Sequence, residues 1–267
     1  MNETLKRSIS GVIYVILLIA SIVFSSESFF ILFGIFLLIA VYEFCSLLHI
    51  QKIVPIGIAA VFFVLFYKVP FNRTYDLILL AATLLVSIKL ILFLFSTRSL
   101  PIDSSSKYMY LLGYIIFPFI IITKLPFGIQ GYNPKIIISI FLLIWTNDTF
   151  AYIVGKSIGK NKLFERISPK KTIEGFVGGL FFAVLASVLI SKYYIEGATP
   201  IWIGIAAIVG IFGTIGDLIE SKFKRIAGVK DSGKIMPGHG GVLDRLDSVI
   251  FVAPIVFLLY QILYYVS

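Results

Sequence analysis

The stretch FFILFGIFLLIAVYEFCSLL, Phe29–Leu48, is almost entirely apolar over 20 residues. An α-helix rises about 1.5 Å per residue, so about 20 apolar residues span the hydrocarbon core of a bilayer. Similar runs recur along the whole 267-residue chain, which is 59% hydrophobic and only 14% charged. No long polar block interrupts them. The sequence therefore predicts one membrane domain, 1–267, without a separate soluble domain.

The apolar runs predict an all-α, polytopic integral membrane protein with about nine transmembrane helices, within a range of eight to ten. The third run is short and is the least secure span. We expect residues 1–130 to form a lipid-facing scaffold of helices and residues 131–267 to form the catalytic part. The expected spans lie near residues 8–25, 29–48, 53–67, 76–95, 108–123, 135–155, 174–192, 201–219 and 249–266.

The basic residues predict the orientation. Two stretches, 156–171 and 222–245, hold twelve of the 23 Lys and Arg residues. Two expected spans separate them, so both stretches lie on one side, which the positive-inside rule places in the cytoplasm. The N-terminus, with Lys6 and Arg7, is then cytoplasmic too. This bias also accounts for the net charge of +9, so we expect a multi-pass protein of the cell (inner or plasma) membrane and no nucleic-acid partner.

The scarcity of soft ligands restricts any metal site. The chain has one cysteine, Cys45, and two histidines, His49 and His239. An intrachain disulfide and a zinc site built from thiolates or several histidines are therefore excluded. A metal would need carboxylate, hydroxyl or phosphate oxygens, which favours magnesium or a similar hard cation.

The segment WTNDTFAYIVG, Trp145–Gly155, places an acid inside an expected span. Asp148 would lie roughly 10 Å below the cytoplasmic end of that helix. An ionised Asp at the centre of a bilayer costs about 2.5–3.5 kcal/mol on insertion scales, and less near the edge. Asp148 is thus a candidate functional acid. The alternative is an acid that is merely paired with a Lys or hydrogen-bonded by Asn147 and Thr149.

The segment SPKKTIEGFVGG, Ser168–Gly179, has the pattern of a helix start, with Ser168 as the N-cap and proline at the first helical position. Lys170 and Lys171 would then occupy the first turn, together with Thr172. The helix dipole disfavours cations there unless an anion binds, because backbone N–H groups and both ammonium groups would then converge on it. The alternative is a basic patch that contacts lipid headgroups.

The segment GDLIESKFKR, Gly216–Arg225, places Asp217, Ser221 and Lys224 at i, i+4 and i+7, on one face of a helix. A carboxylate, a hydroxyl and an ammonium group there suit a complex of metal and phosphate. The alternative is a helix that emerges into water with ordinary surface charges. That reading explains Lys222 and Arg225 well but explains Asp217 poorly, because apolar residues still flank it.

The segment KDSGKIMPGHGGVLDRLDS, Lys230–Ser248, precedes the last apolar run. Its centre, Pro237–Gly241, cannot form a regular helix, and its glycines let backbone amides approach an anion closely. Asp244, Arg245 and Asp247 follow, and the two acids share a face if they are helical. The alternative is helix capping by acids, for which one acid would suffice.

Ser221–Asp247 reads S-x-x-K-R-x4-K-D-S-G-K-x-x-P-G-H-G-G-x-x-D-R-x-D, which resembles the signature of phosphatidate cytidylyltransferases, the CDP-diacylglycerol synthases. The segments WTNDTFAYIVG and SPKKTIEG also resemble parts of that family, whereas residues 1–130 match only as generic membrane helices. The resemblance implies a dimeric, multi-span nucleotidyltransferase of phospholipid biosynthesis. Such enzymes convert phosphatidate and CTP to CDP-diacylglycerol and pyrophosphate, with Mg²⁺ and, in some members, K⁺.

The resemblance and the residue patterns together define the expected site. The expected metal ligands are Asp217 and Asp244, with Asp148 and Asp247 as additional candidates. The expected catalytic residues are Asp217, Ser221, Lys224, Asp244 and Asp247. The expected substrate-binding residues are Ser168, Lys170, Lys171, Thr172, Arg225, Lys230, Asp231, His239 and Arg245.

Two other functions fit parts of the sequence. A membrane kinase that phosphorylates a lipid alcohol such as a polyprenol with CTP would use similar basic loops and a divalent metal. A transporter would also carry intramembrane acids, but its polar residues should follow a path across several helices. Here they cluster on one side and in two loops, which disfavours transport.

Overall fold

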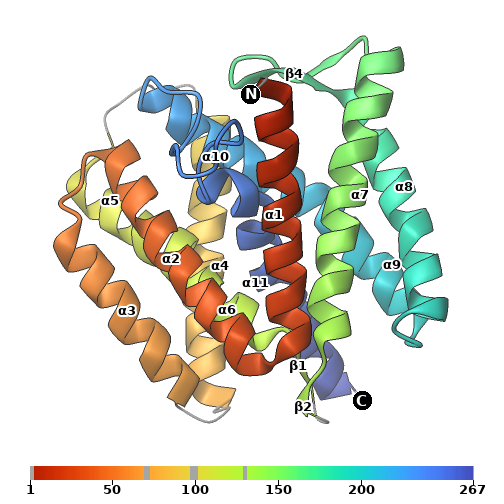
Figure 1. Ribbon diagram of the computed structural model, residues 1–267, viewed down its shortest axis with the longest axis horizontal. Coiled ribbons are helices and arrows are strands. Elements are labelled where there is room, and N and C mark those ends of the chain that lie inside the picture. Colours follow the sequence, from red (N-terminus) through yellow and green to blue (C-terminus); the bar gives the residue numbers. More distant parts are fainter. Residues whose placement is uncertain (1–2, 69–72, 97–101, 129–130, 267) are drawn as a thin grey trace.

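The computed structural model describes residues 3–68, 73–96, 102–128 and 131–266, which form a helical bundle with two small β-hairpins (Figure 1). The helices are α1 Glu3–Phe24, α2 Ser26–Leu48, α3 Ile53–Lys68, α4 Arg73–Phe95, α5 Ser104–Tyr110, α6 Phe117–Lys124, α7 Pro134–Ile158, α8 Ile173–Tyr193, α9 Thr199–Ile208, α10 Thr214–Ile226 and α11 Leu243–Val266. Two π-helical segments, η1 Leu111–Ile116 and η2 Val209–Gly213, join α5 to α6 and α9 to α10. The hairpins are β1 Phe127–Gly128 with β2 Gly131–Tyr132, and β3 Lys162–Phe164 with β4 Ser168–Thr172.

The expected all-α, polytopic membrane architecture is confirmed. In the described residues, seven helices are long and apolar enough to cross a membrane, counting 104–124 and 199–226 as continuous helices. Two shorter apolar helices, Ser8–Phe24 and Ile53–Phe66, coincide with the first and third expected spans. The number of helices that cross the bilayer stays a prediction, as does the division of the domain near residue 130.

Helices α10 and α11 extend beyond the apolar spans that the sequence predicted for them. The eighth expected span, 201–219, continues as α10 to Ile226, and α11 begins at Leu243 rather than near 249. Polar contacts explain the extension, because Lys224 on α10 lies 2.6 Å from an oxygen of Asp244 on α11. Hydropathy detects only the apolar portion of such helices. The candidate acids therefore lie on regular helix.

The expected helix start at Ser168 is wrong. Ser168–Thr172 forms strand β4, which pairs antiparallel with β3 so that Lys162 faces Thr172. The N-cap of α8 is instead Thr172, whose Oγ1 accepts the N–H of Gly175 at 3.1 Å. Pro169 lacks an N–H donor and fits a short hairpin strand at an edge. Lys170 and Lys171 thus precede the helix and do not lie in its first turn.

Glycines determine how closely α7 and α8 pack. A Cβ at Gly175 would lie 2.6 Å from the carbonyl oxygen of Ala151, and one at Gly179 would lie 2.6 Å from that of Asn147. These separations are too short for any side chain, so only glycine allows the two backbones to approach. Small residues serve the same purpose at helix crossings within membranes.

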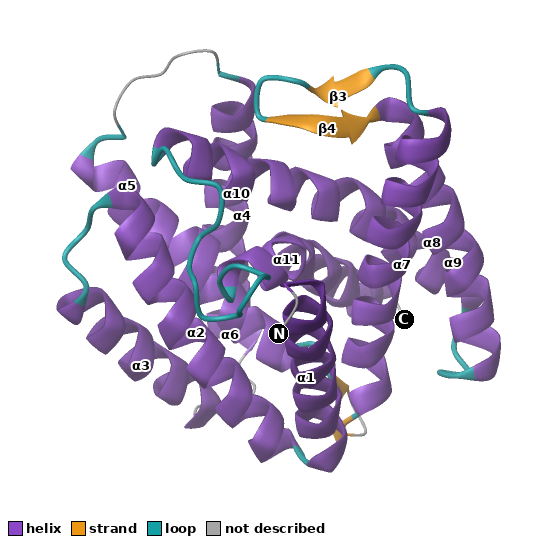
Figure 2. Ribbon diagram, turned by 45° about the horizontal axis from the view of Figure 1, so that its top comes forward, coloured by secondary structure: helices purple, strands orange, loops and turns teal. Residues whose placement is uncertain are grey.

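The polar elements gather at one end of the bundle. The start of α1, the β3–β4 hairpin and the end of α10 lie at the top of Figure 1, whereas the β1–β2 hairpin and the end of α11 lie at the bottom. In Figure 2, α11 lies at the centre among the other helices. Its Leu246, Ile250 and Ala253 are fully buried. The two basic stretches are therefore at the same end, as the charge pattern indicated.

Candidate active site

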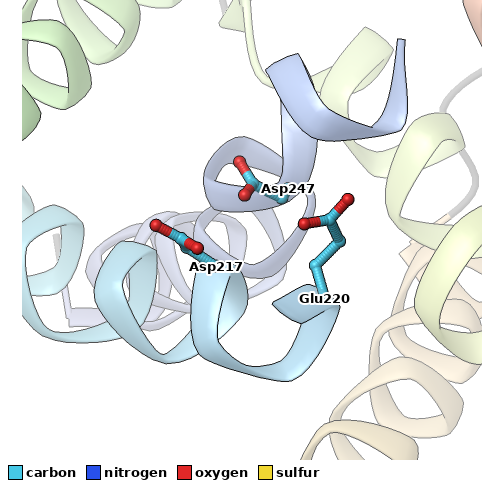
Figure 3. Close-up of side chains that lie close together, drawn as sticks. All are labelled: Asp217, Glu220 and Asp247. Atoms are coloured by element: carbon cyan, nitrogen blue, oxygen red, sulfur yellow. The ribbon is translucent and has the colours of Figure 1, made fainter. Parts of the chain in front are cut away.

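Helices α10 and α11 bring three acids together at the polar end. Asp217 and Glu220 extend from α10 and Asp247 from α11, and their carboxylates point toward one another (Figure 3). One oxygen from each lies within 4.8 Å of the others. Gly216 permits this approach, because a Cβ there would lie 2.7 Å from the carbonyl oxygen of Asp247. We call Asp217, Glu220 and Asp247 the acidic cluster.

Two lysines partly balance the acidic cluster. Lys171 of β4 forms an ion pair with Asp217, and Lys224 of α10 forms one with Glu220. Burial lowers the pKa of the Lys171 ammonium group, but the carboxylate of Asp217 outweighs this effect, with further contributions from Asp148 and Asp247. The pKa of Lys171 is thereby held above its ordinary value, so Lys171 carries a positive charge at neutral pH.

The acidic cluster fits a hard divalent cation. All of its donors are carboxylate oxygens, the ligands that Mg²⁺ prefers. Glu220 is fully buried, and its carboxylate oxygens have no hydrogen-bond partner among the described residues, apart from the ion pair with Lys224. Three carboxylates this close repel one another strongly, and a bound cation would relieve that repulsion.

Asp244, one of the two expected metal ligands, has a different environment. Its Oδ1 lies 2.6 Å from Lys224 Nζ. Its Oδ2 accepts the N–H and the hydroxyl of Ser232, each at 2.8 Å, and the N–H of Gly241 at 2.7 Å. Asp244 therefore connects α10, the loop before α11 and the start of α11. Its role as a metal ligand stays a prediction, and this geometry favours a supporting role.

The polar face expected on α10 is present, but its members have different partners. Ser221 Oγ donates to Asp217 Oδ1 at 3.2 Å, whereas Lys224 contacts Glu220 and Asp244. The interpretation of Lys222 as an ordinary surface charge is wrong. Lys222 is buried, and it donates to the carbonyl oxygens of Phe93 and Ser96 at the end of α4. Carbonyl groups at a helix C-terminus attract cations, so Lys222 fixes α10 against α4.

Residues 232–242, which we call the glycine-rich loop, form an irregular loop, as their composition indicated. Gly238 and Gly240 have φ angles of 78° and 86°, a region that favours glycine. His239 lies against α1, where Ser10 Oγ is 2.8 Å from its Nδ1. The same hydroxyl donates to the carbonyl oxygen of Pro237 at 3.0 Å. This contact with the first helix was not expected from the sequence.

The remaining expected binding residues fall into two groups. The first consists of exposed side chains, which solutes at the polar end can reach: Lys170, Arg225, Lys230, Asp231 and Arg245. The second consists of Ser168, which is half-buried, and Thr172, which is buried and caps α8. The hydroxyl oxygen of Thr172 thus already accepts a hydrogen bond from a backbone N–H.

A cavity of about 290 Å³ lies beside the acidic cluster, between α1, α7, the glycine-rich loop and α11. Its lining combines aromatic rings with charged groups and includes Tyr14, Trp145, Asp148, His239, Arg245 and Asp247. Asp148 accepts a hydrogen bond from the Asn147 side chain at 3.2 Å. The structure thus brings Asp148 of α7 close to residues of the C-terminal signature.

Two residues of this site were missed by the sequence reasoning. Glu220 lies within the segment already quoted, and an acid three residues after Asp217 and four before Lys224 was a usable signal. Tyr14 lines the cavity from α1, and its hydroxyl is buried without a hydrogen-bond partner among the described residues. The sequence offered no signal for Tyr14, because its neighbours form an ordinary apolar helix.

Comparison with known proteins agrees with the signature. The cytidylyltransferase family model matches residues 5–263. Proteins named phosphatidate cytidylyltransferase are similar to this chain: that of Staphylococcus aureus (strain COL) is 53% identical over 117 residues, covering 43% of this chain and 45% of the relative. That of Staphylococcus haemolyticus (strain JCSC1435) is 50% identical over 117 residues, which again cover 43% of this chain and 45% of the relative.

A third relative, from Staphylococcus epidermidis (strain ATCC 35984), is 48% identical over 123 residues, covering 45% of this chain and 47% of the relative. The matched segments therefore span less than half the length of these curated relatives. The family model, in contrast, extends from α1 into α11. On this evidence the protein belongs to the cytidylyltransferase family.

Proposed function

We propose that the protein transfers the cytidylyl group of CTP to phosphatidate, giving CDP-diacylglycerol and pyrophosphate in phospholipid biosynthesis. One observation carries the proposal: the acidic cluster, flanked by Lys171 and Lys224, lies at one end of a bundle of apolar helices. A water-soluble polyphosphate and a lipid headgroup can meet there. The family and the names of the relatives support the same reaction.

The chemistry suits these residues. A phosphate oxygen of phosphatidate attacks the α-phosphorus of CTP, and the bond from that phosphorus to the β-phosphate oxygen breaks, releasing pyrophosphate. The phosphate nucleophile is already anionic near neutral pH, so no strong general base is needed. The difficulty is to bring two anions together and to stabilise charge on the leaving group. Positioning and positive charge should therefore dominate catalysis.

Mg²⁺ is the proposed cofactor. Asp217, Glu220 and Asp247 would hold it, and the bound ion would neutralise charge on the triphosphate and on the departing pyrophosphate. Asp244 would keep Lys224 and the glycine-rich loop in place, as its contacts indicate. Asp148, which lines the same cavity as Asp247, is the candidate ligand for a second cation such as K⁺.

The basic residues would bind the phosphates. Lys171 and Lys224 adjoin the acidic cluster, and Arg245 and His239 line the cavity. Lys170 and Lys230 are exposed at the same end and would attract both anions from a longer distance. The hydroxyl of Tyr14, which has no hydrogen-bond partner in the described part of the chain, is a further candidate donor within the cavity.

The proposed setting is the cell membrane, with the N-terminus and both basic stretches in the cytoplasm, and the proposed assembly is a homodimer. The orientation can be tested with single cysteines in a Cys45→Ala background. A cysteine at Ile235, in the glycine-rich loop, should react with an impermeant thiol reagent only from the cytoplasmic side. One at Gly128, in the β1–β2 hairpin, should react only from outside. Reversed labelling would reject the orientation.

Labelled CTP tests the reaction itself. With purified protein, phosphatidate and Mg²⁺, label at the α-phosphate should enter the organic phase, whereas label at the γ-phosphate should stay aqueous as pyrophosphate. The opposite pattern, tested also with a polyprenol as the acceptor, would identify a CTP-dependent lipid kinase. It would reject the proposed transfer.

A further inference from the structure

Glu43 is a buried acid in α2, far from the signature in sequence but in contact with it. Its side chain is almost fully buried. Its carboxylate accepts the N–H groups of Val242 at 3.1 Å and Leu243 at 2.9 Å, and the hydroxyl of Ser232 at 3.2 Å. Glu43 thus contacts both ends of the glycine-rich loop at once.

These contacts hold the start of α11. The first N–H groups of a helix have no partner within the helix, and the dipole makes that end attractive to anions. Leu243 begins α11, so the carboxylate of Glu43 caps this helix from a neighbouring one. No ion pair with Glu43 is found among the described residues. Because a buried charge is costly without partners, the loop and helix end must stay docked on it.

The loop is shaped to fit this carboxylate. A Cβ at Gly233 would lie 2.8 Å from Glu43 Cδ, and one at Gly241 would also overlap the carboxylate. A side chain at either position would therefore require the Glu43 carboxylate to move away from the place where it accepts these hydrogen bonds. The signature glycines at 233 and 241 have a physical role that involves a residue of the N-terminal half.

Glu43 is connected to the acidic cluster through two short routes. The backbone N–H of Ser232 donates to Asp244, and the Ser232 hydroxyl lies within hydrogen-bond distance of both Glu43 and Asp244. Asp244 in turn contacts Lys224, the ion-pair partner of Glu220. The second route is α11 itself, since Asp247 lies one helical turn after the capped residue Leu243. We infer that Glu43 is a positioning residue: it sets the place of Asp247 and Lys224 for cation and phosphate binding. This inference rests on the proposed function.

The test compares Glu43→Gln with Asp76→Asn. Gln is nearly isosteric with Glu but presents an NH₂ group where the carboxylate accepts hydrogen bonds. Asp76 is the matched control, because it is also a buried acid of the N-terminal half but pairs with Lys124 instead. Hydrogen exchange of residues 232–243 in detergent reports loop docking directly, and the Mg²⁺ dependence of turnover reports the consequence at the site.

In Glu43→Gln we expect exchange at 232–243 to accelerate about tenfold or more, because hydrogen bonds to a charged acceptor are lost. Turnover should fall about 10- to 100-fold at standard Mg²⁺ and should partly recover at high Mg²⁺. Asp76→Asn should leave both the local exchange and the Mg²⁺ dependence as in wild type. Glu43→Asp, which keeps the charge, should lie between wild type and Glu43→Gln.

Unchanged exchange at 232–243 in Glu43→Gln would overturn the inference, as would a turnover loss that excess Mg²⁺ leaves untouched. An equal response in Asp76→Asn would reduce Glu43 to a general stability residue. If Glu43→Gln does not fold, Ser232→Ala is the test, because it removes one of the three donors to Glu43. Hydrogen exchange at 232–243 should then rise severalfold. Unchanged exchange in Ser232→Ala would reject the inference that Glu43 anchors the loop. If wild type makes no CDP-diacylglycerol, the proposed function fails, whereas the exchange measurement still decides whether Glu43 anchors the loop.

Discussion

Two ionic sites in this protein differ in their balance of charge. In the first, one acid, Asp76 of α4, forms an ion pair with one base, Lys124 of α6, at 2.7 Å, and both side chains are nearly inaccessible. In the second, the ion pairs found among the described residues give the three acids of the acidic cluster two lysines, Lys171 and Lys224, and Lys224 also contacts Asp244. A balanced pair needs nothing more, whereas an excess of carboxylates calls for a cation. We infer from this imbalance that the acidic cluster is a cation site and that the Asp76–Lys124 pair is structural.

The largest expected effect follows from removing charge from the acidic cluster. Asp217→Asn should lower turnover about 100-fold or more while the protein still folds, because stabilisation of phosphate charge is the main catalytic contribution. Turnover per folded protein, normalised by size-exclusion chromatography in detergent, measures this loss. Near-normal turnover at ordinary Mg²⁺ concentrations would contradict the role of Asp217. Asp247→Asn should behave similarly.

Cation binding should also be visible without turnover. Mg²⁺ should raise the thermal unfolding midpoint of wild type in the absence of substrates, because a ligand that binds only the native state stabilises it. In Glu220→Gln this Mg²⁺-dependent shift should largely disappear. Ca²⁺ serves as a second hard cation for comparison. An equal shift in wild type and in the Glu220 variant would place cation binding elsewhere.

The Asp76–Lys124 pair should contribute to stability rather than to turnover. Asp76→Asn should destabilise the protein by about 3 kcal/mol, because it removes one member of a buried ion pair and leaves the charge of the other without that carboxylate. Turnover per folded molecule should stay near the wild-type value, since this pair lies away from the acidic cluster. Reversible unfolding in mixed detergent, combined with the labelled-CTP assay, separates the two quantities. A large turnover loss with unchanged stability would remove the distinction between the two sites.

The sequence predicted the apolar helices, the all-α class and the gathering of the polar segments at one end, because these depend on composition and period alone. It did not predict that Glu220 joins Asp217, or that Asp244 holds a loop, because side-chain partners depend on how α10 and α11 pack. It also missed Tyr14 and Glu43, which reach the site from otherwise apolar helices. Glu43 is an acid within an expected span and carried the same signal as Asp148, whereas Tyr14 left no local signal in the chain.

The error at Ser168 shows a related limit. Serine followed by proline is a reasonable helix start, but Thr172 provides an equally good cap four residues later. Pairing of β4 with β3 decides between the two, and a five-residue strand is too short to be recognised from its own pattern. The consequence is chemical as well as structural, because strand geometry separates two lysines that a helix turn would have placed together.

The smallest expected effect concerns those two lysines. Successive residues of a strand point to opposite sides, so Lys170 is exposed whereas Lys171 is half-buried against Asp217. Lys170→Ala should therefore change turnover less than about fivefold, mainly through the apparent KM for CTP at low ionic strength, where long-range attraction matters. Lys171→Met should cost considerably more and should not depend on salt. Titrating CTP at two salt concentrations for both variants tests the difference. Equal losses in the two variants would indicate that both lysines bind phosphate together, as a helix start at Ser168 would have required.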